Sequence, residues 1–244
     1  MATVAIIGIQ IINILKQVHQ RAIVHNDIKP KNICWGKFSY SSLIEKESFF
    51  LIDFGYARKI GNLIKDNEKN NIENFKLVHY EDKYENKYEG TPKFMAIRVL
   101  EGFRPSRRTD IEELLYTLIF LVKKKLPWDN IKGKNHLDVC KKMFAIKKGI
   151  RLSELFNDLP NEFMYIYKNI IKLEFSEEPE YELYIILLNN ILRRFNINDE
   201  EKQKVFIKEK INNLLGIKRI ITTQEKKDNV TNIIFEGFPL NIIN

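Results

Sequence analysis

The chain has 244 residues, enough for one domain of ordinary size or two small ones with a substantial buried core. Hydrophobic residues make up 44% and charged residues 30%, a composition that indicates a globular protein and excludes a disordered, collagen-like or membrane chain. The net charge is +8, and two sources of this excess stay open. One is an AT-rich genome that favours Lys, Asn and Ile codons, and the other is a surface that attracts phosphate-rich or acidic partners.

Cysteine usage and the N-terminus set the expected compartment. Cys34 and Cys140 stand far apart without a CxxC or Cys/His cluster, so we expect neither a disulfide framework nor a structural zinc site. The apolar N-terminus lacks a basic start and a cleavage site, and no run of 18 apolar residues predicts a membrane span. We therefore expect a cytoplasmic protein, with the nucleus equally open.

The elements are predicted in chain order from hydrophobic spacing. Apolar residues recur every three or four positions from Val4 to Val18, which predicts a helix. Short β-type runs at 33–35 and 49–52 flank a polar stretch and predict a hairpin with a long connection. Residues 61–88 are charged, Asn-rich and aperiodic, and we expect them to form a mobile loop. Helical spacing with proline breaks then predicts helices over 110–123, 135–147, 161–173, 180–195 and 199–215.

Two short motifs carry residues suited to phosphoryl transfer. The first, HNDIKPKN, contains His25, Asp27, Lys29 and Asn32, and the second, FLIDFGYA, contains Asp53. Transfer of a phosphoryl group from ATP requires a positioned hydroxyl, a cation near the moving phosphate and oxygen ligands for Mg²⁺. One carboxylate and one amide oxygen, with phosphates supplying the rest, satisfy a magnesium ion.

Each of these residues also has an ordinary structural interpretation. An Asp in a loop is usually a turn former or cap, and a buried His is usually a hydrogen-bonded core residue. The ordered combination favours catalysis: H-x-D-x-K-P-x-N, then DFG after a β-run, then Gly90 and Thr91, then a buried helix led by Asp110, then LPW.

These motifs together resemble the C-terminal lobe of a protein kinase, and within that superfamily the casein kinase I group, which includes the tau-tubulin kinases and vaccinia-related kinases. The group's character appears in SRRTDIEELLYTLIFLVKKKLPW and in LPNEFMYIYKNIIKLEFSEEPEYELY. The resemblance covers residues 4–196. It implies a mainly α (α+β) fold, a helical kinase C-lobe with a short β-hairpin, and an absent N-terminal β-rich lobe.

The resemblance also implies a division of the chain into segments. Residues 1–198 correspond to the kinase C-lobe, with the catalytic loop at 25–32, DFG at 53–55, the activation segment at 53–98 and the central helix at 110–123. Residues 199–244 are expected to form a C-terminal helix and a tail of unknown role.

Roles for single residues follow from the resemblance. It implies that Asp27 orients a Ser or Thr hydroxyl and accepts its proton, that Lys29 pairs with the γ-phosphate, and that Asn32 and Asp53 hold Mg²⁺. Thr91 is expected to hydrogen-bond toward Asp27 and Lys29, so the catalytic set is Asp27, Lys29 and Thr91. ATP and Mg²⁺ are the implied cofactors, with Lys29, Asn32 and Asp53 as the binding residues. Asp110 is expected to brace the catalytic loop.

A candidate anion pocket is implied at Arg107 and Arg108, where the casein kinase I group carries basic residues. The alternative is that both arginines are solvated or pair with Glu112 and Asp110. The implied partner is a protein substrate with Ser or Thr, acidic or pre-phosphorylated; we expect no nucleic acid and no membrane partner.

Two functions remain open from the sequence. The first is a Ser/Thr protein kinase of casein kinase I type, present as a truncated or incomplete chain, since no Gly-rich loop or strand lysine precedes residue 25. The second is a non-catalytic kinase-like module, a pseudokinase, that binds a partner. A nucleic-acid-binding domain would depend on charge alone, without aromatic and basic residues interleaved.

Overall fold

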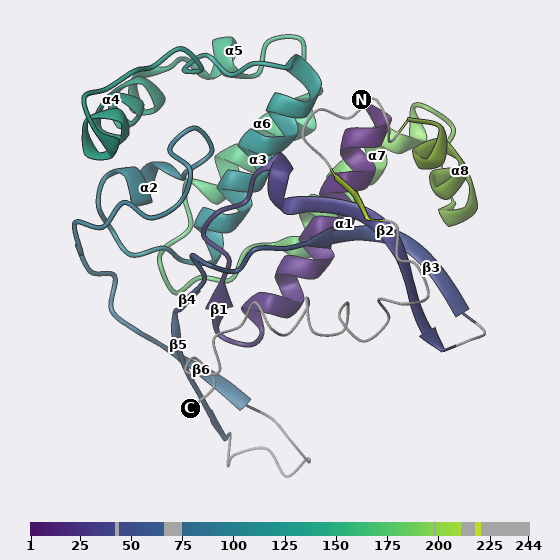
Figure 1. Cartoon of the computed structure of the whole chain (residues 1–244), viewed down its shortest axis with the longest axis horizontal. Helices are drawn as coiled ribbons and strands as arrows, with labels where there is room; N and C mark the ends of the chain where they lie inside the picture. Colours follow the sequence, from purple (N-terminus) through teal and green to yellow (C-terminus); the bar gives the residue numbers. More distant parts are fainter. Residues whose placement is uncertain (42–43, 66–74, 198, 211–217, 221–244) are drawn as a thin grey trace.

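Residues 1–41, 44–65, 75–197, 199–210 and 218–220 are described by the structure, a computed structural model (Figure 1). Its helices are α1 (Ala2–His19), α2 (Ile97–Leu100), α3 (Arg107–Lys123), α4 (His136–Gly149), α5 (Leu152–Leu155), α6 (Asn161–Ile170), α7 (Tyr181–Arg193) and α8 (Glu200–Lys210). Its strands are β1 (Ile23–Val24), β2 (Ile33–Ser41), β3 (Ile44–Leu51), β4 (Arg58–Lys59), β5 (Gly61–Lys65), β6 (Phe75–His79) and β7 (Lys218–Ile220).

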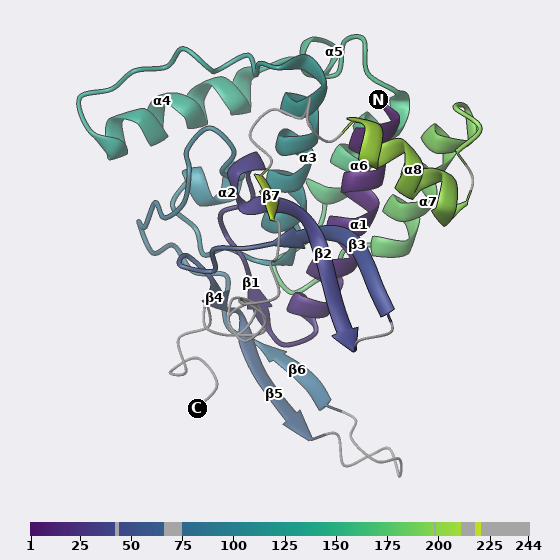
Figure 2. The same cartoon turned by 45° about the vertical axis from the view of Figure 1, so that its right-hand side comes forward.

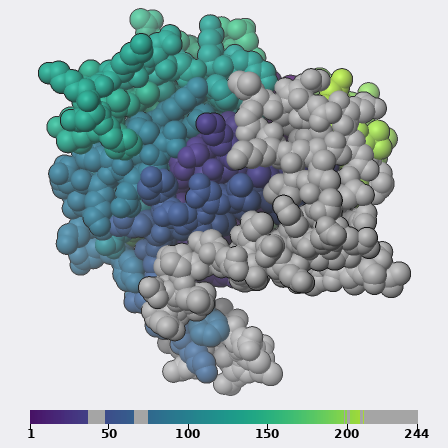
Figure 3. Space-filling model, viewed as in Figure 1, coloured from purple at the N-terminus to yellow at the C-terminus, as the bar shows by residue number. Residues whose placement is uncertain are grey.

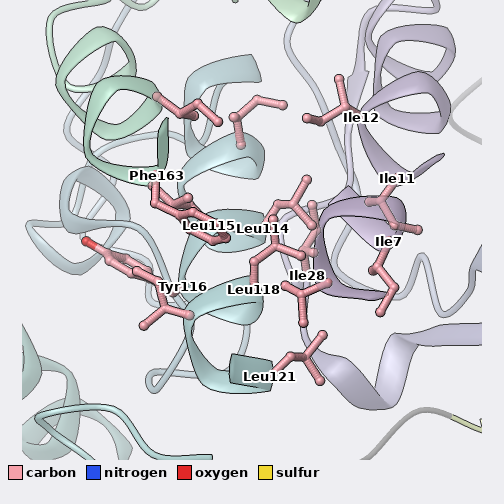
Figure 4. Close-up of a cluster of buried hydrophobic side chains, with 14 of the residues drawn as sticks. Ile7, Ile11, Ile12, Ile28, Leu114, Leu115, Tyr116, Leu118, Leu121 and Phe163 are labelled. Atoms are coloured by element: carbon pink, nitrogen blue, oxygen red, sulfur yellow. The ribbon is translucent and has the colours of Figure 1, made fainter. Parts of the chain in front are cut away.

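Helix α1 packs against both α3 and α7 and supplies one side of the core (Figure 4). Ile7 and Ile11, four positions apart, are fully buried and face Leu114 and Leu118 of α3. Each such burial contributes about 1.5–3 kcal/mol to folding. The helix predicted over Val4–Val18 is confirmed. By length and hydropathy, α1 is also the one helix in the described ranges that could span a bilayer, although 67% of it is buried inside the fold.

Helix α3 supports the candidate site, because its side chains hydrogen-bond to the 25–32 loop. It begins after Ser106, whose backbone N–H donates to the Thr109 hydroxyl at 3.0 Å, while that hydroxyl donates to the Ser106 carbonyl at 2.7 Å. It ends at Lys124, which adopts a φ of 62° in the left-handed region. The predicted central helix therefore starts three residues earlier than expected, because the capping residues precede the apolar run.

Strands β2 and β3 form an antiparallel hairpin beside α1. Trp35 lies opposite Phe49, and their buried rings meet edge to face with centroids 4.8 Å apart. The Phe49 N–H donates to Gln10 Oε1 at 2.9 Å, which ties the hairpin to α1. Strand β7 runs parallel along the other edge of β2 (Figure 2).

The predicted loop over 61–88 is wrong in part. Strands β5 and β6 pair there as an antiparallel hairpin that extends away from the helices (Figure 2). Most of their side chains are exposed, so the pairing depends on backbone hydrogen bonds and leaves little apolar alternation in the sequence. Gly61 permits close approach, because a Cβ there would lie 2.3 Å from the Val78 carbonyl oxygen. Residues 66–74 lie outside the described residues.

The predicted hairpin is confirmed, because residues 33–35 pair with 49–51, but its short length and long connection are wrong. Residues 36–41, expected in the connection, continue β2, and β3 begins at Ile44. The described residues contain three small sheets, ordered β1–β4, β3–β2–β7 and β5–β6. Their strands are short or pair across long stretches of sequence, and local patterns therefore did not reveal them.

The other predicted helices correspond to α4, α6, α7 and α8, each within a few residues of its predicted bounds. Helices α2 and α5 were not predicted, because four residues are too few to show a hydrophobic period. The end of the helix predicted over 199–215 lies outside the described residues, as does the tail from 221 to 244.

Candidate active site

Asp110 holds the first residues of the 25–32 loop from the first turn of α3. Its Oδ2 accepts a hydrogen bond from the His25 backbone N–H at 2.7 Å, and its Oδ1 accepts one from the Asn26 N–H at 2.8 Å. Asn26 has a φ of 62°, a left-handed conformation that Asn tolerates better than most residues. Because Asp110 is fully buried, water does not compete for these bonds. Asp110 therefore braces the loop on α3.

A buried histidine and tyrosine complete the surroundings of Asp110. His19 Nε2 lies 2.8 Å from Asp110 Oδ2, and His19 Nδ1 lies 2.7 Å from the Tyr181 hydroxyl. A carboxylate accepts, so Nε2 carries a hydrogen that it donates to Asp110, and Nδ1 shares a hydrogen bond with the phenol. Burial raises the pKa of Tyr181. The ends of α1, α3 and α7 thus meet at one carboxylate, which sequence patterns did not reveal because these residues are far apart in the chain.

Helix α3 also binds the middle of the loop. Glu113 Oε2 accepts a hydrogen bond from the Ile28 N–H at 2.9 Å, and the Thr117 hydroxyl donates to the Ile28 carbonyl at 3.0 Å. Burial raises the pKa of Glu113 well above its ordinary value, and the nearby Asp110 carboxylate adds to the rise. Sequence analysis missed Glu113. The signal was two adjacent glutamates within an apolar helix, since buried carboxylates require hydrogen-bond partners.

The candidate catalytic residues of the loop lie within hydrogen-bond distance of one another. Lys29 Nζ is 2.5 Å from Asp27 Oδ2 and 2.9 Å from the Thr91 hydroxyl. Asn32 Nδ2 donates to the Asp27 carbonyl at 2.9 Å and to Asp27 Oδ2 at 3.2 Å. The structure therefore brings together Asp27, Lys29, Asn32 and Thr91, with Thr91 linked to Lys29.

Asp53 reaches the same region through strand pairing. The Ile52 N–H donates to the Asn32 carbonyl at 2.9 Å, so Asp53 follows directly after a residue bonded to Asn32. His25 Nε2 lies 3.0 Å from the Ile52 carbonyl on the other side of the same residue. Asp53 itself is exposed, with a φ of 65° and its Oδ1 3.4 Å from the Gly55 N–H. The carboxylate of Asp53 thus faces solvent at the edge of the Asp27 group.

The oxygen atoms of this group fit a magnesium ion that keeps waters and phosphate ligands. Asp27 Oδ1 is buried and has no hydrogen-bond partner among the described residues. Asn32 uses its amide nitrogen toward Asp27, which leaves its Oδ1 available to a cation, and Asp53 offers an exposed carboxylate. The described ranges contain no group of three His, Cys, Asp or Glu that could enclose a metal ion. Such a sparse donor set suits Mg²⁺ bound together with a polyphosphate.

Arg107 and Arg108 point into the protein. Arg107 Nη2 donates to the Ser176 carbonyl at 2.5 Å, and Arg108 Nη1 donates to the Leu173 carbonyl. Both residues are at most 9% exposed, and Arg108 also lies 3.6 Å from Asp82. Of the two sequence alternatives, these contacts resemble internal pairing more closely than a surface anion pocket, although the partners differ from those expected.

The hydrogen bonds of the His25 ring are those of a neutral imidazole. Its Nε2–H donates to the Ile52 carbonyl, and its Nδ1 accepts from the Asp27 N–H at 3.3 Å, so neither ring nitrogen has room for a second proton without losing a bond. Burial lowers the pKa of His25, while the Asp110 carboxylate opposes the fall. The folded state therefore binds a proton at lower pH than the unfolded chain.

We expect the His25 contribution to the free energy of unfolding to fall as the pH drops below about 6.5, the ordinary histidine pKa, because this side chain then binds more protons in the unfolded chain. The raised pKa of Glu113 acts in the opposite sense and is common to the parent chain and the variant. His25 contributes stability that is present above that pH and lost as the pH falls through its folded pKa. Urea unfolding between pH 7.5 and 5 measures this, and His25→Asn should flatten the pH slope. His79, whose pKa burial also lowers, accounts for part of the remaining slope. An unchanged slope in His25→Asn contradicts the assignment.

Comparison with known proteins identifies the family. The family described as the protein kinase domain matches residues 2–182. The match is to the kinase domain and begins at the second residue, so the predicted fold class, a C-lobe with the N-terminal β-rich lobe absent, is wrong. The prediction inferred a missing lobe because no Gly-rich loop or strand lysine precedes residue 25, and the family match over residues 2–182 overturns it.

The curated relatives include several casein kinase I proteins. A casein kinase 1-like protein of Oryza sativa subsp. japonica is 30% identical over 78% of this chain and 24% of its own length. A probable casein kinase I homolog of Encephalitozoon cuniculi is 26% identical over 81% of this chain and 59% of its own. Casein kinase I homolog 2 of Schizosaccharomyces pombe is 28% identical over 78% and 41%. The chain thus spans between 24% and 59% of these relatives' lengths.

The face shown in Figure 3 places early residues of the chain, in purple and blue, directly beside the teal segments that follow residue 75. This agrees with the hydrogen bonds that join the 25–32 loop to Thr91 and to α3. With the family match covering most of the sequence, the chain belongs to the protein kinase family, and within it the chain is similar to the casein kinase I proteins.

Proposed function

We propose that this chain is a Ser/Thr protein kinase of casein kinase I type that transfers the γ-phosphate of ATP to protein hydroxyls. The single observation that supports this most is the Asp27 carboxylate. One of its oxygens is held by Lys29 and Asn32, while the other is buried without a partner among the described residues. A general base needs a free oxygen within reach of the hydroxyl it deprotonates.

Asp27 acts on the substrate hydroxyl in this proposal. Its free Oδ1 accepts a hydrogen bond from the Ser or Thr O–H and takes the proton as the hydroxyl oxygen forms its bond to phosphorus. The bond from phosphorus to the bridging oxygen breaks, and ADP leaves with the electron pair. Lys29 donates to the γ-phosphate oxygens. The Thr91 hydroxyl accepts a hydrogen bond from the Lys29 amine and so fixes the position of this amine beside Asp27.

Asn32 and Asp53 are the residues that would hold Mg²⁺ and, through it, the nucleotide phosphates. The ion supplies neutralisation of the phosphate charge that builds up in phosphoryl transfer. Asn32 is fixed by its bonds to Asp27, whereas Asp53 is exposed and joins from the strand end that follows Ile52. Asn32 is therefore preorganised, and Asp53 would supply the second oxygen ligand from the solvent side.

Acidic or pre-phosphorylated proteins are the proposed substrates. The net charge of +8 favours encounter with such chains. Arg107 and Arg108 are not assigned to substrate binding, because their guanidinium groups are bound to internal carbonyls.

Radiolabelled phosphate transfer tests the proposed function. Purified chain is incubated with γ-labelled ATP, Mg²⁺ and casein, followed by phosphoamino acid analysis, with EDTA as the metal-free control. We expect label on Ser and Thr, none on Tyr, loss of transfer with EDTA, and preference for an acidic peptide over its basic counterpart. Absence of transfer would support the non-catalytic module instead, and label on Tyr would refute the Ser/Thr assignment.

A further inference from the structure

Lys147 is a buried cation that the proposed reaction does not use. It lies in the last turn of α4 and is only 2% exposed, whereas its neighbour Lys148 extends into solvent. Burying an ammonium group costs several kcal/mol unless its donors find partners. The position of Lys147 therefore requires an explanation in its contacts.

The amine of Lys147 binds the backbone of the segment 91–96, which we call the docking segment. Its Nζ donates to the Met95 carbonyl at 2.6 Å and to the Pro92 carbonyl at 3.3 Å. Trp128 Nε1 donates to the Lys93 carbonyl at 2.7 Å. Three carbonyls of one short segment are thus bound by two side chains from outside it.

An aromatic and acidic shell surrounds the Lys147 amine. Nζ lies 4.4 Å from the centre of the Tyr116 ring and 4.7 Å from that of Trp128, distances typical of cation–π contacts. Burial lowers the pKa of Lys147 to about 7, and the carboxylates of Glu112 and Glu113 oppose the fall. The shell supports a cation that is cut off from water.

Glu112 and Glu113 bind two further backbone segments near Lys147: the residue after the docking segment and the 25–32 loop. Glu112 Oε1 accepts from the Ile97 N–H at 3.0 Å, just past the docking segment. Glu113 accepts from the Ile28 N–H in the 25–32 loop. Adjacent residues of α3 therefore bind the docking segment's end and the catalytic loop, with Lys147 beside both.

The docking segment transmits its position to the Asp27 group. The N–H groups of Phe94 and Met95 donate to the Thr91 carbonyl at 2.9 and 3.0 Å, which folds the segment into one tight turn. Thr91 at its start binds Lys29, which binds Asp27. A shift of the Met95 carbonyl would therefore move Thr91 relative to the carboxylate.

We propose that Lys147 is a positioning residue that holds the docking segment on α3 and thereby sets where a protein substrate lies against Asp27. The effect on protein substrate rests on the proposed kinase function. The hold of Lys147 on residues 91–96 does not depend on that function, because it is argued from hydrogen bonds alone. Lys147 touches neither nucleotide nor hydroxyl in this arrangement, so its effect falls on the binding of protein substrate rather than of ATP.

Hydrogen exchange and kinetics of Lys147→Met test the proposal. Met fills the space without donating, so exchange of the Phe94 and Met95 amides should rise by about tenfold or more, while the amides of the α1 core keep their protection. The KM for a protein substrate should rise about tenfold, with the KM for ATP within about twofold. Lys148→Met, a change of the same size at an exposed site, should alter none of these quantities.

Further outcomes separate this proposal from simple loss of stability and from the proposed function. Equal acceleration of exchange throughout the chain, or no change, would overturn it. If Lys147→Met does not fold, Trp128→Phe removes the donor to the Lys93 carbonyl together with one ring of a fully buried side chain, and faster exchange confined to the docking segment, with the α1 core still protected, then supports the proposed hold on this segment. Absence of that local effect overturns it. Local loosening without any phosphate transfer by the parent chain would refute the kinase proposal alone.

Discussion

Replacing Asp27 with Asn is expected to lower kcat for phosphate transfer to protein by roughly 10²–10⁴-fold, the usual contribution of a general base. Asn retains an oxygen that accepts from Asn32 and Lys29, so the loop should keep its geometry. It has no basic oxygen to take the proton of the substrate hydroxyl. The measurement is steady-state kinetics with casein, together with ATP binding by fluorescence titration, which should change by less than about threefold.

A matched control separates loss of the base from loss of charge. Glu182→Gln also neutralises one carboxylate, but Glu182 is exposed and pairs with Lys16 on the surface. Its kcat should remain within about twofold of the parent chain. If Asp27→Asn retained more than about a tenth of the parent kcat, Asp27 would not be the general base, and the assignment of the 25–32 loop as catalytic would have to be revised.

Asp110→Asn is expected to lower the free energy of unfolding by about 3–5 kcal/mol, because removing one partner from a buried charged network leaves the others unsatisfied. Asp110 accepts three hydrogen bonds, from His25 N–H, Asn26 N–H and His19 Nε2. An Asn amide offers one acceptor and turns a donor toward at least one of these groups. Urea unfolding followed by tryptophan fluorescence measures the change.

Two graded variants test whether the whole network carries that effect. Tyr181→Phe removes only the neutral hydrogen bond to His19 Nδ1 and should cost about 1 kcal/mol. Glu182→Gln weakens an exposed pair with Lys16 and should cost at most about 1 kcal/mol. A loss below about 1.5 kcal/mol for Asp110→Asn would show that the loop is held mainly by Glu113 and Thr117, whose bonds to Ile28 remain in that variant.

The short motifs predicted the group of candidate residues correctly but led to a wrong prediction of the fold. The HNDIKPKN motif brought Asp27, Lys29 and Asn32 together as candidates, and hydrogen bonds link these residues in the structure. Residues this close in the chain are held near one another by a single loop, so their spacing carries the information. The inference of a missing lobe used instead the absence of a Gly-rich loop and a strand lysine before residue 25, and the family match over residues 2–182 overturned it.

The helices were predictable because their signal is local. Ile7 and Ile11 repeat at helical spacing, and the buried stripe they form is a property of one segment. The β5–β6 hairpin was not predictable, since its mostly exposed side chains show no alternation of buried and exposed positions and the pairing depends on backbone bonds. The surroundings of Arg107 and Arg108 were also left open. The local sequence does not show whether an arginine side chain is solvated or bound to carbonyls inside the protein, because those carbonyls lie far away in the chain.

The amino-acid sequence by itself determined the helical framework, the order of the motifs and the candidate residues of the 25–32 loop. Only the tertiary structure decided which partners the buried charges have. His19 and Tyr181 meet at Asp110, and Lys147 binds the carbonyl of Met95, across separations at which no periodic pattern survives. A buried charge must find its partner wherever the packed core brings one within hydrogen-bond distance, and packing is a property of the whole chain.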